Sequence, residues 1–305
     1  MSDLNIEILK EFGINEVESV KNLSYEDRER WYVNDKYFLK KFTDLDKLEK
    51  TLFINTELYQ AGVPVAKYYK TNTGKFYAEI NNEYYSLAKK IAGSHDEFDP
   101  TGAFALGQNI AKLHTALKQL SDKSSYPIVK MSEMHNLHSF ALNAISEKQL
   151  AVRKEITDYC INFDELYTSL QTQLIHGDLH RWNILFKHGE VTAFLDLEIL
   201  QAETRLKDIW YFMNAELDHI DKTEELVEKW LETFKSLLSG YNTVSELKKE
   251  ELDALTYMLV LHNLNAVPFL SNAGFPVDKV IEKLNWLYDN KSKFSFSIED
   301  ITLNE

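Results

Sequence analysis

The segment LIHGDLHRWNILFKHGEVTAFLDL, residues 174–197, places a run of polar side chains between apolar ones. Its second half predicts a short hairpin that turns at His188 and Gly189. Asn183 opens the first hairpin strand and Asp196 ends the second. Because a hairpin brings its two ends together, we expect these two side chains to lie close to one another.

Carboxylate and amide oxygens that converge at the base of a loop suit a hard cation such as Mg²⁺. Asp178 lies one loop turn before Asn183 and is placed to accept a hydrogen bond from an incoming hydroxyl. A positioned hydroxyl and a metal ion that neutralises phosphate charge are what phosphoryl transfer requires. The spacing of Asp178, Asn183 and Asp196 therefore favours this chemistry over a loop cap and a turn residue.

A second interpretation of the same segment is a hydrolase metal site. His176, Asp178 and His180 form the pattern H-x-D-x-H, and histidine and carboxylate are common zinc ligands. Such a site usually needs further histidines nearby, and only His188, in the expected turn, is available.

Composition describes an ordinary globular chain. Of its 305 residues, 44% are hydrophobic and 27% are charged, and no stretch approaches the roughly 20 apolar residues of a membrane span. The N-terminus does not read as a signal peptide, and the single cysteine, Cys160, fits a reducing cytoplasm. The net charge of −14 gives no basic footprint for nucleic acid and favours cationic small molecules. We therefore expect no nucleic-acid or membrane partner.

Two regions differ in their expected secondary structure. Residues 1–90 predict strands around one helix at 45–62, with a hairpin signal at Asn34-Asp35 and further strands at 63–69, 75–80 and 84–91. The rest is mostly helical, with helices expected near 132–145, 148–159, 163–173, 206–218, 223–239, 246–264 and 277–289. The fold class is α+β, with a small sheet-rich lobe before a larger helical lobe.

The motif HGDLHRWN followed by FLD resembles the catalytic core of the aminoglycoside phosphotransferase and choline kinase-like family, relatives of protein kinases. The segments YFLKKF, AGVPVA and LGQNIAKLHTAL extend the resemblance over most of the chain. It implies a bilobal protein-kinase-like fold. Residues 1–90 would form the N-terminal nucleotide-binding lobe and residues 91–305 the C-terminal catalytic and substrate lobe.

The resemblance also implies roles for residues of the motif. Asp178 matches the catalytic aspartate, and Asn183 and Asp196 match the metal ligands. His176 is expected to pack beneath the loop as a structural residue. Asp208, in RLKDIWYF, matches the aspartate that braces the catalytic loop through backbone hydrogen bonds.

For the nucleotide, YFLKKF looks like the strand that carries the phosphate-binding lysine. Strand alternation puts Lys40 on the face of Phe38 and Phe42, so we place the phosphate-binding lysine at Lys40 and expect Lys41 to be solvated. The loop NLSYEDRER has no glycine, and a hydroxyl and N–H from it would meet a β-phosphate. Ser24 is expected to supply this hydroxyl and N–H, and Glu49 is expected to pair with Lys40. Ala88 and Lys90, where the lobes join, are also expected at the nucleotide.

The acceptor is the part that the motif leaves most open. Glu198, Trp210 and Tyr211 follow the motif and are substrate candidates, and the helical lobe holds further acidic and tryptophan residues. These favour a cationic amino sugar or amino alcohol.

The expected function is a small-molecule kinase that uses ATP or GTP with Mg²⁺, as a cytoplasmic monomer or homodimer. Homoserine or a simple sugar remains an alternative acceptor. A non-catalytic kinase-fold protein with a binding or assembly role, like some spore-coat relatives, is the alternative from a different class.

Overall fold

The computed structural model describes residues 6–25, 28–95, 98, 100–123, 134–161 and 163–302. The chain divides into two compact units. The first combines Met1–Phe98 with Trp182–Ile199, and the second combines Asp99–Arg181 with Leu200–Glu305. A sheet dominates the first unit and helices dominate the second, which confirms the α+β class.

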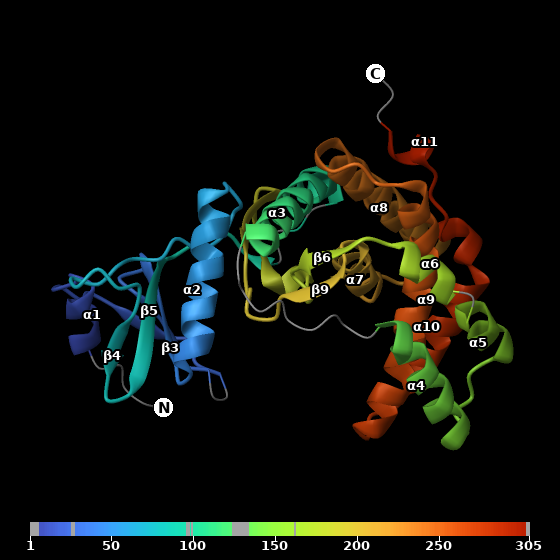
Figure 1. Cartoon of the computed structure of the whole chain (residues 1–305), viewed down its shortest axis with the longest axis horizontal. Helices are drawn as coiled ribbons and strands as arrows, with labels where there is room; N and C mark the ends of the chain where they lie inside the picture. Colours follow the sequence, from blue (N-terminus) through green and yellow to red (C-terminus); the bar gives the residue numbers. More distant parts are fainter. Residues whose placement is uncertain are drawn as a thin grey trace. The chain divides into compact units, whose positions relative to one another are not determined.

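The first unit is built on a five-stranded antiparallel sheet in the order β1-β2-β3-β5-β4 (Figure 1). Asn34 and Asp35 have φ values of 52° and 51°, the left-handed pair that a two-residue hairpin turn demands. They join β2 to β3 and confirm the predicted hairpin. The strand bounds are β1 (Val20–Asn22), β2 (Arg30–Val33), β3 (Tyr37–Phe42), β4 (Ala78–Ile80) and β5 (Glu83–Lys89).

Helix α2 (Leu45–Gln60) lies beside this sheet (Figure 1), and α1 (Glu7–Glu11) contacts β4. Asp44 caps α2 by accepting a hydrogen bond from the Lys47 N–H at 3.0 Å. Leu48 and Leu52 are buried and pack against Phe42 of β3. This apolar contact fixes which face of α2 turns to the sheet.

The strand expected at 63–69 does not form, apart from an isolated bridge between Tyr68 and Ala88. Pro64 has no N–H to give to a strand ladder. Its carbonyl accepts instead from the N–H of Phe194 at 2.8 Å, so the segment pairs with a part of the chain far away in sequence.

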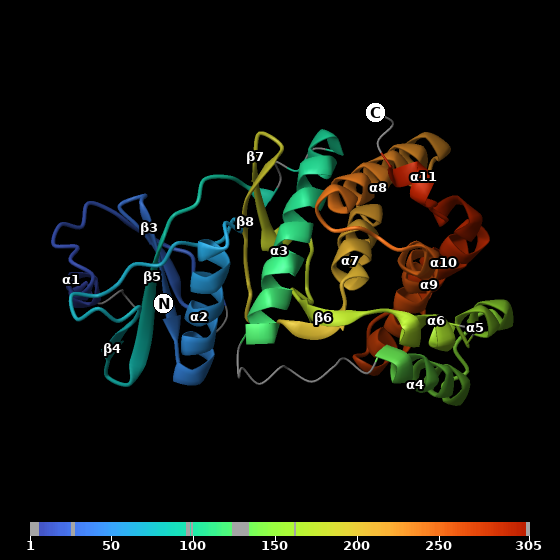
Figure 2. The ribbon, with the colours of Figure 1, turned by 45° about the horizontal axis from the view of Figure 1, so that its top comes forward.

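Phe194 belongs to the hairpin of β7 (Ile184–Lys187) and β8 (Glu190–Phe194) (Figure 2). Its turn is at His188 and Gly189, with φ values of 54° and 78°, as the sequence predicts. The hairpin also pairs with the first unit through Ser94 and Phe186. The sequence-based division at residue 90 gave this hairpin to the second lobe, whereas these backbone bonds tie it to the first unit.

In the second unit, α3 (Ala103–Lys123) and α8 (Glu224–Val244) pack side by side (Figure 2). Glycines allow the close approach, since a Cβ on Gly107 would overlap the carbonyl of Leu237 and one on Gly240 the carbonyl of Phe104. The pair holds His114 and Tyr241 in the interior.

Most of the remaining elements follow the sequence pattern. The helix expected at 148–159 begins only at Lys154. The helix expected at 163–173 ends at residue 169, and residues 172–175 form strand β6, paired antiparallel with β9. Pairing distant in sequence overrides the local helical pattern here. The bounds are η2 (Pro100–Gly102), α4 (Met134–Glu147), α5 (Lys154–Ile161), α6 (Phe163–Ser169), β6 (Thr172–Ile175), η3 (Arg181–Asn183), β9 (Gln201–Thr204), α7 (Leu206–Leu217), α9 (Lys249–Asn272), α10 (Asp278–Asp289), η4 (Lys291–Phe294) and α11 (Ile298–Ile301).

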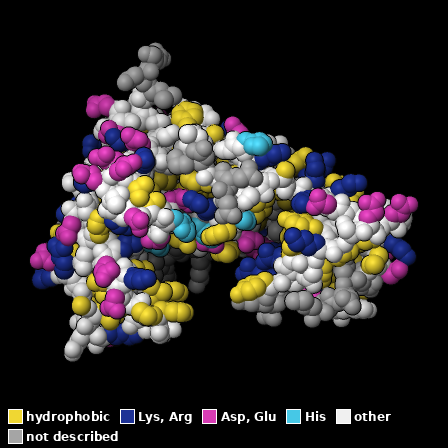
Figure 3. All heavy atoms as spheres, turned by 180° about the vertical axis from the view of Figure 1, so that it is seen from behind, with side chains coloured by type: hydrophobic (Ala, Val, Ile, Leu, Met, Phe, Trp, Pro, Cys, Tyr) yellow, Lys and Arg dark blue, Asp and Glu magenta, His cyan; other side chains and the backbone are white. Residues whose placement is uncertain are grey.

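None of the helices in the described ranges has the length and apolarity to cross a membrane. On the face shown in Figure 3, acidic and basic side chains are interspersed over the surface. The charge of the chain is thus mixed locally on this face, although acidic residues outnumber basic ones by 48 to 34.

Candidate active site

The loop after β6 is anchored by a buried carboxylate. The N–H groups of His176 and Gly177 donate to Asp208 Oδ2 and Oδ1, each at 2.8 Å. Asp208 lies in the first turn of α7 and is fully buried. His114 Nε2 lies 2.9 Å from Asp208 Oδ2, and Tyr241 hydrogen-bonds to the other ring nitrogen of His114.

Burial works to raise the pKa of the Asp208 carboxyl. The hydrogen bond and charge of His114, the charge of His176 and the N–H of Gly177 outweigh burial and hold this pKa below its ordinary value. Asp208 is therefore an ionised brace that fixes the loop from below.

Gly177 has a φ of 84°, a left-handed conformation that suits glycine and turns the chain sharply. His176 and Leu179 on either side are fully buried, while the Asp178 side chain keeps 31% of its surface exposed. The loop thus presents the Asp178 carboxylate to solvent from a rigid base.

Two side chains of the second unit hold this carboxylate. His180 Nε2 lies 3.5 Å from Asp178 Oδ2, and the Tyr211 hydroxyl hydrogen-bonds to Asp178. Burial works to raise the pKa of Asp178, but the bonds to His180 and Tyr211 hold it below its ordinary value. Asp178 is therefore ionised at neutral pH and able to accept a proton or a hydrogen bond.

Arg181 gives a further anchor that the sequence motif did not predict. Its Nε donates to Glu216 Oε1 at 2.9 Å, and its NH2 also contacts this carboxylate. Glu216 is buried on α7. A charged residue on the apolar face of the helix expected at 206–218 was the signal in the sequence that a basic partner lies close by.

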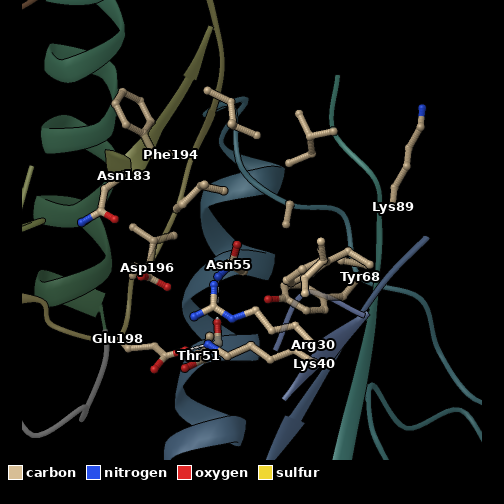
Figure 4. A pocket seen from close by; sticks show the side chains of 18 of the residues that line it. Arg30, Lys40, Thr51, Asn55, Tyr68, Lys89, Asn183, Phe194, Asp196 and Glu198 are labelled. Carbon is tan, nitrogen blue, oxygen red and sulfur yellow. Dashed lines mark hydrogen bonds and ion pairs between the residues drawn. The ribbon is translucent and has the colours of Figure 1, made fainter. Parts of the chain in front are cut away.

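In the first unit, a cavity of about 270 Å³ lies among the sheet, α2 and the β7–β8 hairpin (Figure 4). Asn183 and Asp196 both line it. The hairpin joins them, because the N–H of Leu195 donates to the Asn183 carbonyl at 2.8 Å. Asp196 has a φ of 52°, where the chain leaves the strand. The structure thus brings these two residues to one cavity.

Lys40 lines the same cavity from β3. Its Nζ contacts Glu198 Oε1, and Lys47 Nζ lies 2.9 Å from the other oxygen of Glu198. Burial works to raise the pKa of Glu198, whose side chain is 12% exposed, but the charge and hydrogen bond of Lys40 hold this pKa below its usual value. Glu198 thus links Lys40 to Lys47 of α2. The sequence predicted Glu198 as a substrate candidate, and in the structure its carboxylate is engaged by these two lysines.

The prediction that Glu49 pairs with Lys40 is wrong. Glu49 is exposed and accepts a hydrogen bond from the Tyr77 hydroxyl at 3.2 Å. Because Leu48 and Leu52 face the sheet, Glu49 points away from the cavity. Thr51 and Asn55 are the α2 residues that line it.

Ser24 does not point into the cavity either. Its N–H donates to Asn22 Oδ1 at 2.7 Å, and its hydroxyl accepts the N–H of Arg30 at 3.0 Å. Both groups that were expected to meet a phosphate therefore close the β1–β2 loop on itself.

At the end of β5, Ala88 lines the cavity, together with Lys89, but Lys90 does not. The Lys90 ammonium pairs with Asp35 and lies 4.7 Å from the centre of the Tyr32 ring. The Lys90 side chain therefore faces the β2–β3 turn, and its prediction as a nucleotide residue is not supported by its position.

Lys41, expected to be solvated, is 16% exposed and pairs with Glu29 and, at 2.6 Å, with Glu83. It lies on the opposite face of β3 from the cavity of Lys40, as strand alternation requires, but neighbouring carboxylates cover it.

The aromatic residues considered for the substrate site differ in their exposure and their contacts. Trp210 is fully buried and packs on His262 with ring centres 4.6 Å apart, so its ring is not open to an acceptor. Trp230 is also buried and donates to the Met213 carbonyl. Tyr211 alone of these three reaches Asp178.

A second cavity, of about 860 Å³, lies within the helical unit and is lined by α7, α9 and α10. Trp286 lines it, together with carboxylate and lysine side chains. Asp218 and Lys283 pair at 2.6 Å. The charged lining residues are Asp218, Asp221, Glu282, Lys222, Lys279 and Lys283, so this wall carries both signs of charge instead of the acidic surface that the sequence suggested.

The hydrolase interpretation finds no support in the described part of the chain, where no group of three or more His, Cys, Asp or Glu side chains is arranged to hold a metal ion. In the H-x-D-x-H segment, the His176 ring nitrogen Nδ1 lies 3.4 Å from the N–H of Asp178, so His176 serves the loop.

The sheet-rich unit and the helical unit have the fold of kinase-like phosphotransferases of known structure. Residues 21–247 match the model of the phosphotransferase enzyme family, and the chain belongs to that family.

Relatives within this fold differ in what they phosphorylate. A homoserine kinase of Methylobacillus flagellatus is 24% identical over 74% of this chain and 69% of its own length. The serine/threonine protein kinase RdoA of Salmonella typhimurium is 25% identical over 80% of this chain and 73% of its own. The solved structure of amicoumacin kinase hAmiN, in complex with AMP-PNP, Ca²⁺ and Ami, aligns with a TM-score of 0.65 and 18% identity over 99% of this chain and 96% of that one.

Proposed function

We propose that the chain transfers the γ-phosphate of ATP or GTP to a hydroxyl of a small molecule. The observation that carries this proposal is the convergence of Lys40, Asn183 and Asp196 on one cavity. A cation for phosphates and two oxygen ligands for a metal are the parts that a nucleotide-binding site in this chemistry needs. The AMP-PNP and Ca²⁺ bound to the amicoumacin kinase support a nucleotide and a divalent metal in this fold.

Asn183 and Asp196 would hold Mg²⁺, because an amide oxygen and a carboxylate are the hard donors that this ion prefers. When bound, Mg²⁺ neutralises charge on the phosphates. Lys40 would bind phosphate oxygens, and Glu198 would hold Lys40 in place.

Asp178 would orient the acceptor hydroxyl and take its proton. Its depressed pKa keeps it ionised at neutral pH, and the Tyr211 hydroxyl, His180 and the Asp208-anchored backbone fix its position. This role needs a rigid carboxylate that is open to solvent, which the loop provides.

For the acceptor, we propose an amine-bearing small molecule, namely an amino sugar or amino alcohol. Asp218, Asp221 and Glu282 line the helical cavity beside Trp286 and suit an ammonium group through charge and cation–π contact. Tyr211 and Asn214 of α7 and Asp218, which caps its C-terminus, are spaced i, i+3 and i+7, so one side of this helix links the cavity wall to the partner of Asp178. The lysines of the same wall favour an acceptor with few positive charges over a polycation.

Binding of nucleotide separates this function from a non-catalytic role in assembly. Thermal unfolding is measured with millimolar Mg²⁺ and either ATP or GTP. A nucleotide at 100 times its dissociation constant should stabilise the fold by about 2.7 kcal/mol. Absence of a shift with both nucleotides would favour the non-catalytic role.

The acceptor class is tested by nucleotide turnover on a panel of alcohols. We expect turnover on an amino sugar or amino alcohol, and we expect added salt to weaken binding of that acceptor. Turnover on a neutral sugar, with none on any amine, would refute the acceptor class and leave the kinase function standing.

A further inference from the structure

Arg30, at the start of β2, lies opposite Lys40 in the register of β2 and β3. Both side chains line the cavity of Asn183 and Asp196, and in Figure 4 they point from the sheet towards Asp196 and Glu198. The Nε of Arg30 is buried and has no hydrogen-bond partner within the described residues. A guanidinium is always charged and carries five donors, and a buried Nε–H without an acceptor is uncommon, so this group is open to an acceptor that the described residues do not supply.

The cavity itself supplies two carboxylates, Asp196 and Glu198, and within the described residues neither forms an ion pair with Arg30. Glu198 is engaged by Lys40 and Lys47. Asp196 is the proposed metal ligand. The arginine is therefore positioned for an anion that enters the cavity from outside.

The backbone of the β1–β2 loop explains why a side chain is needed. Glycine-rich loops hold phosphates with their backbone N–H groups, but the loop of residues 23–30 has no glycine. Five of its N–H groups, those of Leu23, Ser24, Tyr25, Arg28 and Arg30, already have partners in or next to the loop. Leu23 donates to the Arg30 carbonyl at 2.8 Å, and Tyr25 and Arg28 donate to one another's carbonyls at 3.1 and 3.0 Å. Ser24 donates to the side chain of Asn22 at the end of β1, and Arg30 donates to the Ser24 hydroxyl.

We propose that Arg30 is a phosphate-binding residue for a nucleoside triphosphate, and that its guanidinium replaces the backbone N–H groups of a glycine-rich loop. The inference rests on the proposed nucleotide-dependent function. Arginine suits this task because its planar fork of donors matches two phosphate oxygens at once. The loop contacts at Ser24 hold the backbone of Arg30 and so fix the point from which the side chain reaches into the cavity.

The test compares Arg30→Gln and Arg30→Lys with wild type and with Lys21→Gln, a matched control on the exposed strand β1 of the same sheet. Dissociation constants are measured by calorimetry for Mg-ATP, Mg-GTP, adenosine and guanosine. Arg30→Gln should weaken triphosphate binding about 10- to 100-fold, the scale of hydrogen bonds to a charged group, with less than about threefold change for the nucleoside. Arg30→Lys should fall between, because it keeps the charge and loses the fork. Lys21→Gln should bind like wild type.

Circular dichroism and the unfolding temperature show whether each variant is folded, and Arg30→Lys carries the test if Arg30→Gln does not fold. Triphosphate binding by both Arg30 variants at the wild-type level would overturn the inference alone. Equal weakening of nucleoside and triphosphate would also overturn it, because Arg30 would then shape the base pocket. Failure of the wild-type chain to bind any triphosphate would remove the proposed function and the inference with it.

Discussion

Lys40 of β3 is held by Glu198, a residue two positions after Asp196, and not by a carboxylate of α2. Lys47 of α2 contacts the second oxygen of Glu198 at 2.9 Å. The segment that carries the proposed metal ligand Asp196 therefore also positions the proposed phosphate-binding lysine. In this chain the two functions are joined through one short stretch of sequence.

Glu198→Gln should therefore lower kcat/KM about tenfold or more, because a largely buried carboxylate that pairs with two lysines is lost and Lys40 is no longer fixed. Steady-state kinetics with the active nucleotide measure this. Glu49→Gln is the matched control on α2 and should change kcat/KM by less than about twofold, within the range of surface substitutions. A larger loss with Glu49→Gln than with Glu198→Gln would contradict the assignment.

Lys40→Ala and Lys41→Ala should affect different properties. Lys40 lines the proposed nucleotide cavity, so its loss should reduce activity. Lys41 is largely buried and pairs with Glu29 and Glu83 on the other face, so its loss should lower the unfolding free energy by about 1–3 kcal/mol and spare turnover. Turnover rates and denaturant unfolding of both variants decide this, and equal loss of activity in the two would disprove the division.

Tyr211→Phe should move the acidic limb of the kcat/KM profile to higher pH, by on the order of one pH unit. The Tyr211 hydroxyl stabilises the Asp178 carboxylate, so removing it raises the pKa of Asp178, and the base is lost at a higher pH. Burial and the charge of Asp178 raise the pKa of Tyr211 to about 12, so the hydroxyl keeps its proton throughout a profile from pH 5 to about 9. A limb that stays in place or moves to lower pH would separate Tyr211 from the chemistry.

Asp196→Asn should weaken binding of the Mg-nucleotide complex, because the proposed metal ligand is charged and its replacement is neutral. Isothermal calorimetry with the nucleotide, at several Mg²⁺ concentrations, measures the effect. The loss should become smaller as Mg²⁺ is raised. Binding that is unchanged at every Mg²⁺ concentration would place the metal elsewhere.

Local patterns predicted the elements of this site well. The Asn34-Asp35 and His188-Gly189 turns and the common cavity of Asn183 and Asp196 follow from turn chemistry and hairpin geometry, which act over a few residues. Most helices of the second unit follow from the helical period of their apolar residues. The strand β6 was missed because its partner β9 lies about 30 residues further along the chain.

Side-chain partners were harder to predict, because each depends on contacts between distant segments. Glu49 points away from the cavity because Leu48 and Leu52 face the sheet. Lys90 pairs with Asp35 of the β2–β3 turn. Lys40 pairs with Glu198, which lies 158 residues away in the sequence. The proposed role of Arg30 depends on the hydrogen bonds that Ser24 makes within its loop. None of these contacts leaves a periodic signal in the sequence.

Transfer of a label from γ-labelled nucleotide to the acceptor, by the wild-type chain and by Asp178→Asn, tests the central claim most directly. Wild type should move the label to the alcohol. Asp178→Asn should lower this rate by about 10²–10⁴-fold and bind Mg-nucleotide with nearly unchanged affinity, because Asp178 is assigned to the acceptor hydroxyl. Transfer at the wild-type rate by Asp178→Asn, or loss of nucleotide binding together with transfer, would contradict the account.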